Sequence, residues 1–292
     1  MVEYDEIFVQ ADWLEEHLDD PGVAILDVRT GFRPRPPGAS DFFSMRSNYE
    51  AGHLDRAHYL HMVDDLSDPH GSFPFTALDP NQVRQLLGAL GVSNEQTLVL
   101  YGGNVPPVVH RCWWILAQAG ATDVRVLDCS YDTWVDAGRP VTSKPVVVDS
   151  KRFEGSARPE WIASKEMVFA AIDDPSIGLV NALTKEQFEG RGQFYGKPGR
   201  IPKSISVPAV DLTDPTSGAL RKPDELQEVF DKAGANNFDH LITYCGGGIA
   251  ASTAFLALKL IGRDHIALYD GSLMEWNDDP AAPIEVGPLA HD

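Results

Sequence analysis

The chain has 292 residues, 43% of them hydrophobic and 23% charged, which is the balance of a soluble globular protein with room for two domains. Asp and Glu number 43 against 24 Lys and Arg, so the formal net charge is −19. This acidity argues against nucleic acid and anionic membrane surfaces as partners.

The amino terminus and the cysteines bear on the compartment. Residues 1–6 are acidic and lead into an amphipathic segment, without the basic and apolar regions of a signal peptide. No apolar run is long enough to cross a bilayer. The three cysteines have no short pairing, which argues against a disulfide framework. We therefore expect a cytoplasmic protein that does not bind membranes.

The first half of the chain alternates strand and helix patterns. Residues 23–29 are an apolar strand pattern that ends in polar residues, and residues 98–101 are a second strand that leads into two glycines. An apolar helix follows and stops at Gly120. Residues 31–49 are rich in Pro, Arg and Phe and lack periodicity, so we expect them to form an excursion outside the core.

The second half repeats this order at an offset of 142 or 143 residues. Residues 241–246 match residues 98–103, and each copy continues into an apolar helix, a short strand and a tryptophan. Two copies of one α/β unit are therefore predicted. The domains are expected at 1–142 and 159–292, joined by a linker at 143–158 that holds Pro, Ser, Lys and Arg.

Cys245 is the strongest candidate for chemistry. Four β-prone residues precede it, three glycines follow it, and an apolar helix is predicted over residues 250–261 with Gly262 as its stop. This order places the sulfur at the carboxyl end of a parallel strand, where open α/β sheets bind ligands. Glycines can turn their amides toward the sulfur, and the helix dipole adds positive charge, so the pattern favours a reactive thiolate.

The chain resembles the tandem-domain rhodanese family, the thiosulfate and 3-mercaptopyruvate sulfurtransferases, over nearly its whole length. The segments that carry the resemblance are LDVR at 26–29, GHLDRA at 52–57, GRIP at 199–202, the loop at 245–250 and YDGS at 269–272 before Trp276. The resemblance implies an α/β fold of two rhodanese-like domains, each a mainly parallel sheet flanked by helices. The first domain has no cysteine in its matching loop, so it is expected to be non-catalytic and to form one wall of the cleft.

The implied activity is sulfur transfer through a cysteine persulfide. Cys245 would take the outer sulfur of thiosulfate or 3-mercaptopyruvate and pass it to cyanide or a thiol. A thioredoxin-like reductant is one expected thiol acceptor. Neither a metal nor an organic cofactor is required. The backbone amides expected to cradle the anionic sulfur belong to Gly246, Gly247, Gly248, Ile249, Ala250 and Ala251.

The donor-binding residues depart from the family's pattern. The arginine that the resemblance places beside Phe188 is absent, which leaves Arg191 and Arg200 as the nearest substitutes. The acid-base histidine of mercaptopyruvate enzymes falls near Phe75, and only Asp68 of that constellation is recognisable. The uncharged loop favours mercaptopyruvate or a persulfidic donor, whereas these departures leave the donor open.

Two other functions are compatible with parts of this pattern. A non-catalytic tandem module would tolerate the substituted donor-binding positions. A phosphatase of related fold would need an arginine six positions after the cysteine, where this chain has Ala251. The remaining cysteines, Cys112 in a buried-helix pattern and Cys129 in a turn, are expected to be structural.

Overall fold

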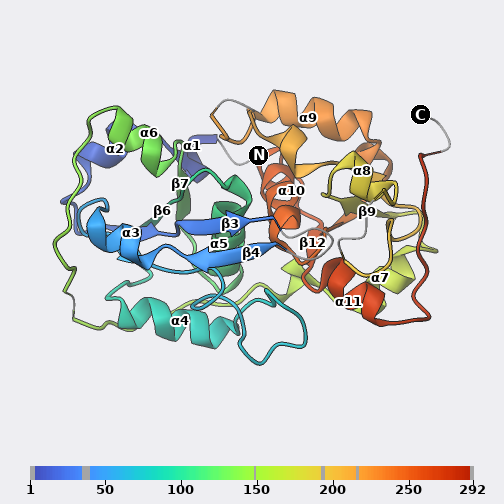
Figure 1. Ribbon diagram of the computed structural model, residues 1–292, viewed down its shortest axis with the longest axis horizontal. Helices are drawn as coiled ribbons and strands as arrows, with labels where there is room; N and C mark the ends of the chain where they lie inside the picture. The colour runs from blue at the N-terminus through green and yellow to red at the C-terminus, as the bar shows by residue number, and fades with distance from the viewer. Residues whose placement is uncertain (1–3, 35–39, 148, 192–194, 215–216, 290–292) are drawn as a thin grey trace.

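The computed structural model describes residues 4–34, 40–147, 149–191, 195–214 and 217–289. Two five-stranded parallel sheets lie side by side, one in each half of the chain (Figure 1). The first sheet has the order β1-β7-β6-β2-β5. Its strands are β1 (Phe8–Val9), β2 (Val23–Asp27), β5 (His58–Tyr59), β6 (Thr97–Tyr101) and β7 (Val124–Leu127).

The second sheet repeats the first strand for strand. Its order is β10-β9-β11-β12-β8, so β11 occupies the central position that β6 has in the first sheet. The strands are β8 (Ile162–Ala163), β9 (Ile177–Asn181), β10 (Ile205–Ser206), β11 (His240–Tyr244) and β12 (Ile266–Tyr269). The prediction of two mainly parallel α/β units is confirmed.

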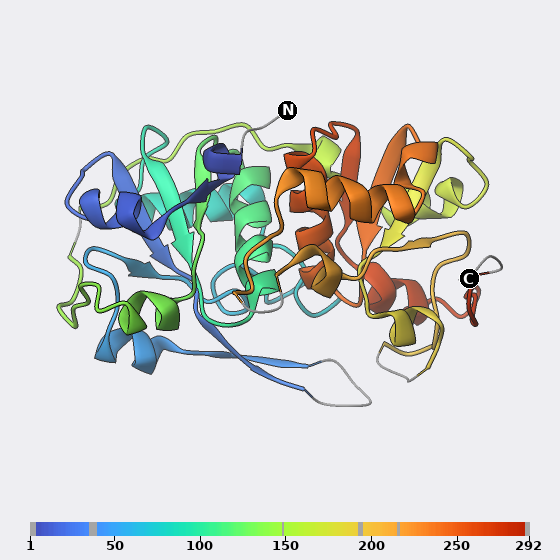
Figure 2. The same ribbon diagram turned by 90° about the horizontal axis from the view of Figure 1, so that it is seen from above.

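Helices cover both faces of each sheet (Figures 1 and 2). The first domain contains α1 (Tyr4–Ile7), α2 (Ala11–Glu16), α3 (Arg46–Ala51), α4 (Pro80–Ala89), α5 (Pro106–Gln118) and α6 (Tyr131–Asp136). The second contains α7 (Lys165–Ala171), α8 (Lys185–Phe188), α9 (Pro223–Lys232), α10 (Ile249–Leu260) and α11 (Ser272–Asp278), with short 3₁₀ turns at Pro159–Trp161, Ala209–Leu212 and Ala235–Asn237. No helix in these described ranges is long and apolar enough to span a membrane.

Helices α5 and α10 pack against each other between the two sheets, at the centre of the molecule (Figure 2). Both are apolar almost all round, as expected for helices buried on every side. Trp114 meets Phe255 edge-on at 6.4 Å, and His110 Nδ1 lies 3.0 Å from Thr253 Oγ1. The core is therefore continuous across the two domains.

The excursion expected at 31–49 contains an ordered hairpin. Strands β3 (Thr30–Arg33) and β4 (Asp41–Ser44) pair antiparallel outside the main sheet and run toward the second domain (Figure 1). Phe42 on β4 meets the ring of Phe75 edge-on at 5.3 Å. The hairpin thus lies outside the sheet, as expected, and supports a residue of the domain interface.

Candidate active site

Cys245 follows β11 directly and lies at the carboxyl edge of the second sheet, between β9 and β12. Residues 245–248 form the loop, and α10 begins at Ile249, one residue earlier than the sequence pattern predicts. Gly262 adopts φ +80° just after the helix, as expected of the stop residue. The strand, loop and helix anticipated around the sulfur are all present.

Ser272 organises the loop. Its Oγ accepts hydrogen bonds from the Cys245 amide at 3.1 Å and from the Gly248 amide at 3.2 Å, and it donates to the Tyr269 carbonyl at 2.8 Å. Ser272 adopts φ +49°, a left-handed conformation that is uncommon for residues other than glycine. One buried hydroxyl therefore fixes both ends of the four-residue loop.

The other amides of the loop and of the first turn of α10 have no acceptor among the described residues. Within the described residues, no hydrogen bond uses the N–H groups of Gly246, Gly247, Ile249, Ala250 or Ala251. Gly248 has φ +81°, which lets the chain turn there and enter α10. Unpaired amides at the start of a helix, with the positive end of its dipole, form a favourable site for an anion.

Apolar side chains close the site from the other side. A Cβ built on Gly246 would lie 2.0 Å from the ring of Tyr195, and one on Gly247 would lie 3.0 Å from Met274 Sδ and 3.2 Å from the ring of Phe75. Cys245 is only 2% exposed. The loop therefore needs glycine at positions 246 and 247, and Cys245 itself is almost fully covered.

The titratable side chains near the loop include Tyr195, Arg111 and Asp270. Burial, with a smaller effect from the charge of Cys245, raises the pKa of the Tyr195 hydroxyl, so Tyr195 keeps its proton at neutral pH. Arg111 and Asp270 form a buried ion pair beside Gly248. No group of three or more His, Cys, Asp or Glu in the described ranges could hold a metal ion.

Two of the predicted donor-binding residues make other contacts. Arg200 is buried, pairs with Glu285 at 3.0 Å and donates to the carbonyl of Gly287. Arg191 is largely exposed and pairs with Glu189 at 2.6 Å. In the described part of the chain, no hydrogen bond or ion pair joins either arginine to the Cys245 loop. Their role in donor binding stays a prediction.

Asp68 lies in the first domain, in the segment that also contains Phe75. Its carboxylate accepts a hydrogen bond from the His70 amide at 2.9 Å, and its amide donates to the Thr76 carbonyl at 2.8 Å. Asp68 therefore shapes the turn before Phe75, and any contact with a donor stays a prediction.

Sequence reasoning named Phe75 only as the place where the resemblance expects a histidine, and it missed the other residues that surround the loop: Arg111, Tyr195, Asp270 and Met274. Asp270 and Ser272 belong to the YDGS segment that the resemblance relied on, so that segment held a usable signal. Phe75, Arg111 and Tyr195 come from distant parts of the chain and carry no local pattern. Only the packing of the two domains and of the segment after residue 194 brings them to the sulfur.

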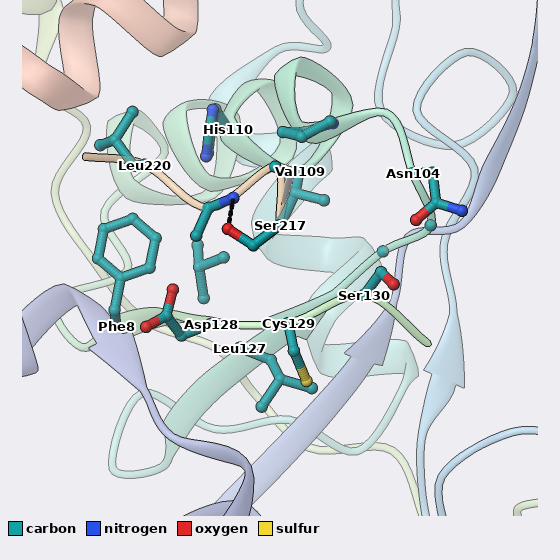
Figure 3. Close-up of a pocket in the computed structure, with 16 residues that line it drawn as sticks. Phe8, Asn104, Val109, His110, Leu127, Asp128, Cys129, Ser130, Ser217 and Leu220 are labelled. Atoms are coloured by element: carbon teal, nitrogen blue, oxygen red, sulfur yellow. Dashed lines mark hydrogen bonds between the residues drawn. The ribbon is translucent and has the colours of Figure 1, made fainter. Parts of the chain in front are cut away.

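The first domain has a cavity at the place that corresponds to the Cys245 loop. It measures about 240 Å³ and lies among the ends of β6 and β7, the start of α5 and residues 217–220 (Figure 3). His110 and Cys129 border it from opposite sides. Burial raises the pKa of the Cys129 thiol to about 11, so this cysteine is protonated at neutral pH.

The comparisons with known proteins agree with this geometry. The rhodanese-like domain family matches the chain twice, at residues 10–137 and 165–279. The chain belongs to the rhodanese-like domain family. Both the family and the fold class predicted from the sequence are confirmed.

Relatives of this rhodanese-like protein align over nearly the whole chain. A Mycobacterium tuberculosis protein provisionally named a thiosulfate sulfurtransferase is 29% identical and aligns with 97% of this chain and 98% of its own length. The 3-mercaptopyruvate sulfurtransferase of Escherichia coli K12 is 27% identical over 95% of this chain and 97% of its own. The crystal structure of SseA from E. coli, a 3-mercaptopyruvate sulfurtransferase by its title, superposes with a TM-score of 0.80, covering 91% of this chain and 98% of SseA at 27% identity. The predicted sulfurtransferase class is confirmed.

Proposed function

We propose that this sulfurtransferase carries sulfane sulfur as a persulfide on Cys245. The observation that supports the proposal most directly is a set of five amides beside a cysteine at the carboxyl edge of the central strand. These amides, which have no acceptor in the described ranges, belong to Gly246, Gly247, Ile249, Ala250 and Ala251. Relatives with sulfurtransferase names cover nearly the full length of the chain. A loop that stabilises a negatively charged sulfur is the requirement of this chemistry.

The reaction has two steps. The Cys245 thiolate attacks the outer sulfur of the donor; a new S–S bond forms, and the electron pair of the old bond leaves with the rest of the donor. The product at Cys245 is a persulfide anion. A thiolate or cyanide acceptor then attacks the outer sulfur, takes it away and returns the Cys245 thiolate.

The amide cradle serves both states of the enzyme. The thiolate and the persulfide each carry one negative charge at nearly the same place, so donors fixed in the backbone can stabilise both without rearranging. Ser272 keeps the Cys245 and Gly248 ends of the loop in position for this. The acceptor, including a thioredoxin-like reductant, and the cytoplasmic location stay predictions.

Mass spectrometry of the intact protein tests the proposal. After exposure to thiosulfate, a persulfide or 3-mercaptopyruvate, and removal of the excess donor, the protein should be heavier by one sulfur atom, and added cyanide should restore its mass and yield thiocyanate. Cys245→Ser should show no gain, whereas Cys129→Ser should behave as the parent protein.

A non-catalytic module is the second candidate, because Cys245 is almost fully covered. A module would keep its mass with every donor at every concentration. If the Cys245→Ser variant still gained a sulfur atom, the proposal would also be contradicted, because the nucleophile would then be another residue.

A further inference from the structure

Phe75 is held in a backbone conformation that aromatic residues rarely adopt. Its φ is +68°, in the left-handed region, although it is neither glycine nor asparagine. Such a conformation costs free energy and persists only where neighbouring contacts enforce it. The contacts that enforce it come from both domains.

Arg111 and Asp270 form an interdomain clamp around the backbone of residues 75–77. The Arg111 Nη2 donates to the Phe75 carbonyl at 2.8 Å and pairs with Asp270 Oδ1 at 2.5 Å. The other oxygen of Asp270 accepts a hydrogen bond from the Ala77 amide at 2.8 Å. Arg111 is completely buried on α5 of the first domain, whereas Asp270 follows β12 of the second.

The clamp places the phenyl ring against the Cys245 loop. Phe75 Cδ2 would lie 3.2 Å from a Cβ at Gly247, and Arg111 Nη1 would lie 3.1 Å from a Cβ at Gly248. Phe42 supports the ring from the hairpin side. The first domain therefore presents a phenyl group to the Cys245 loop, and a phenyl group has no proton to give.

We propose that Phe75 determines donor specificity at Cys245, with Arg111 and Asp270 as its positioning residues, and that the site prefers donors whose transferred sulfur is bonded to another sulfur. These donors are thiosulfate and persulfides. The inference rests on the proposed function, since it concerns the first step of the same transfer.

The preference follows from the leaving groups. When Cys245 attacks thiosulfate, the S–S bond breaks and the electron pair leaves with sulfite; with a persulfide it leaves with a thiolate. Both anions are stable at neutral pH and need no proton. When the sulfur is attached to carbon, as in 3-mercaptopyruvate, the C–S bond breaks and its electron pair leaves with carbon as the enolate of pyruvate. The enolate becomes pyruvate by taking a proton from a positioned acid or, more slowly, from water.

Among the described residues, the other side chains placed at the loop do not replace a proton donor. Arg111 and Asp270 are paired with each other. Tyr195 carries a hydroxyl, but its raised pKa makes it a weak acid. General acid catalysis contributes about 10²–10⁴-fold where it operates. We therefore expect sulfur loading from 3-mercaptopyruvate to be slower than loading from thiosulfate by about 10²-fold or more.

The first experiment measures rates of sulfur loading on Cys245 with thiosulfate, glutathione persulfide and 3-mercaptopyruvate. The parent protein should load faster from the two S–S donors than from 3-mercaptopyruvate. Phe75→His supplies an acid and should reduce the ratio of these loading rates by at least about tenfold. Phe75→Leu supplies no acid and should leave the ratio unchanged. If 3-mercaptopyruvate loads the parent protein as fast as the S–S donors do, the inference is overturned. If Tyr195→Phe then loses loading by 3-mercaptopyruvate, Tyr195 is the acid. Loading by no donor would contradict the proposed function itself.

The second experiment tests the clamp. Arg111→Met and Asp270→Asn should release the ring, raise KM for the S–S donors more than they lower kcat, and change the ratio of rates between donors. Arg111→Lys should restore part of that ratio. Arg125→Met, which removes the ion pair of Arg125 on β7 with the neighbouring Asp123, is the control and should leave the ratio unchanged. Equal losses with all donors in the clamp variants would reduce the clamp to a structural role and overturn this part of the inference.

Discussion

The loops that follow the two central strands, residues 102–105 in the first domain and 245–248 in the second, have the same length and the same position. The amide of Tyr131 donates to the Gly102 carbonyl in one domain, and the amide of Leu273 donates to the Cys245 carbonyl in the other. Tyr101 and Tyr244, which precede the loops, are both anchored through their hydroxyls. The framework around the loops is therefore shared.

The loops differ in the amides they can offer. Helix α10 begins with Ile249, Ala250 and Ala251, whose N–H groups find no acceptor in the part of the chain that the structure describes. Helix α5 begins with Pro106 and Pro107, which have no N–H group. Proline is well suited to the first turn of a helix, so the first domain keeps its fold. The first domain thus lacks two of the helix-start amides of the second, and its loop has no cysteine.

The turns that face the loops differ in the same way. Ser130 caps its own helix by accepting from the Thr133 amide, whereas Ser272 turns its hydroxyl to the amides of Cys245 and Gly248. Asp128 accepts from side chains of its own domain, whereas Asp270 reaches across to Arg111. The same residue types at equivalent positions therefore stabilise the first domain internally, whereas in the second domain they position the Cys245 loop and the domain interface.

The largest expected effect on sulfur loading comes from giving the anion cradle of the second domain a proline that the first domain has. Ala250→Pro removes one free N–H at a position where the first domain itself carries proline. Loss of one such donor typically costs about 10²–10³-fold in rate, and we expect that loss in sulfur loading at Cys245. Ala250→Gly keeps the N–H and is the control. Unchanged loading in Ala250→Pro would mean that this amide does not contact the sulfur.

The two equivalent serines offer a matched pair of stability measurements. Ser272→Ala leaves the buried amides of Cys245 and Gly248 without an acceptor, at a cost of about 1–3 kcal/mol for each. Ser130→Ala loses one helix cap, which is worth about 1 kcal/mol. Urea unfolding should rank the two losses in that order. Equal losses would show that Ser272 holds its loop no more strongly than Ser130 caps its helix.

The pH dependence of stability tests the contact between α5 and α10. Burial lowers the pKa of His110 to about 4 from an ordinary value of 6.5. The neutral ring therefore supports the fold above pH 6.5, and stability falls as the pH drops from 6.5 toward 4, by roughly 3 kcal/mol in all. Unfolding free energies at pH 7 and pH 5 measure this.

His110→Gln is the control for that measurement, because it removes the titrating ring. The pH-dependent loss should become smaller, and the remainder should include His58, whose pKa is also lowered by burial and by Arg56. A pH dependence unaffected by His110→Gln would place the responsible group elsewhere.

The sequence predicted those parts of the molecule that depend on local order along the chain. Strand, glycine loop and helix around Cys245 follow one another directly, so their pattern is readable, and the duplicated pattern predicted the second sheet. Arg111 was missed, and Phe75 was named only as the position of an expected histidine, because the contacts of both residues depend on how the first domain packs on the second. Arg200 was chosen for its charge and its place in a matching segment, but the fold buries it against Glu285. Residue type alone does not show which buried charges face a substrate and which face each other.

The smallest expected effect concerns the cysteine in the turn of the first domain that corresponds to Gly271. Burial raises the pKa of Cys129 to about 11, so only roughly one molecule in 10⁴ carries the thiolate at pH 7. Cys129→Ser should therefore change sulfur loading and release by no more than about twofold, within the usual range for a peripheral substitution. Release of sulfur from loaded protein to cyanide and to a thiol, followed separately, measures both steps. A tenfold slower release to thiols alone would show that Cys129 takes part as a second thiol and that the first domain has kept a chemical role.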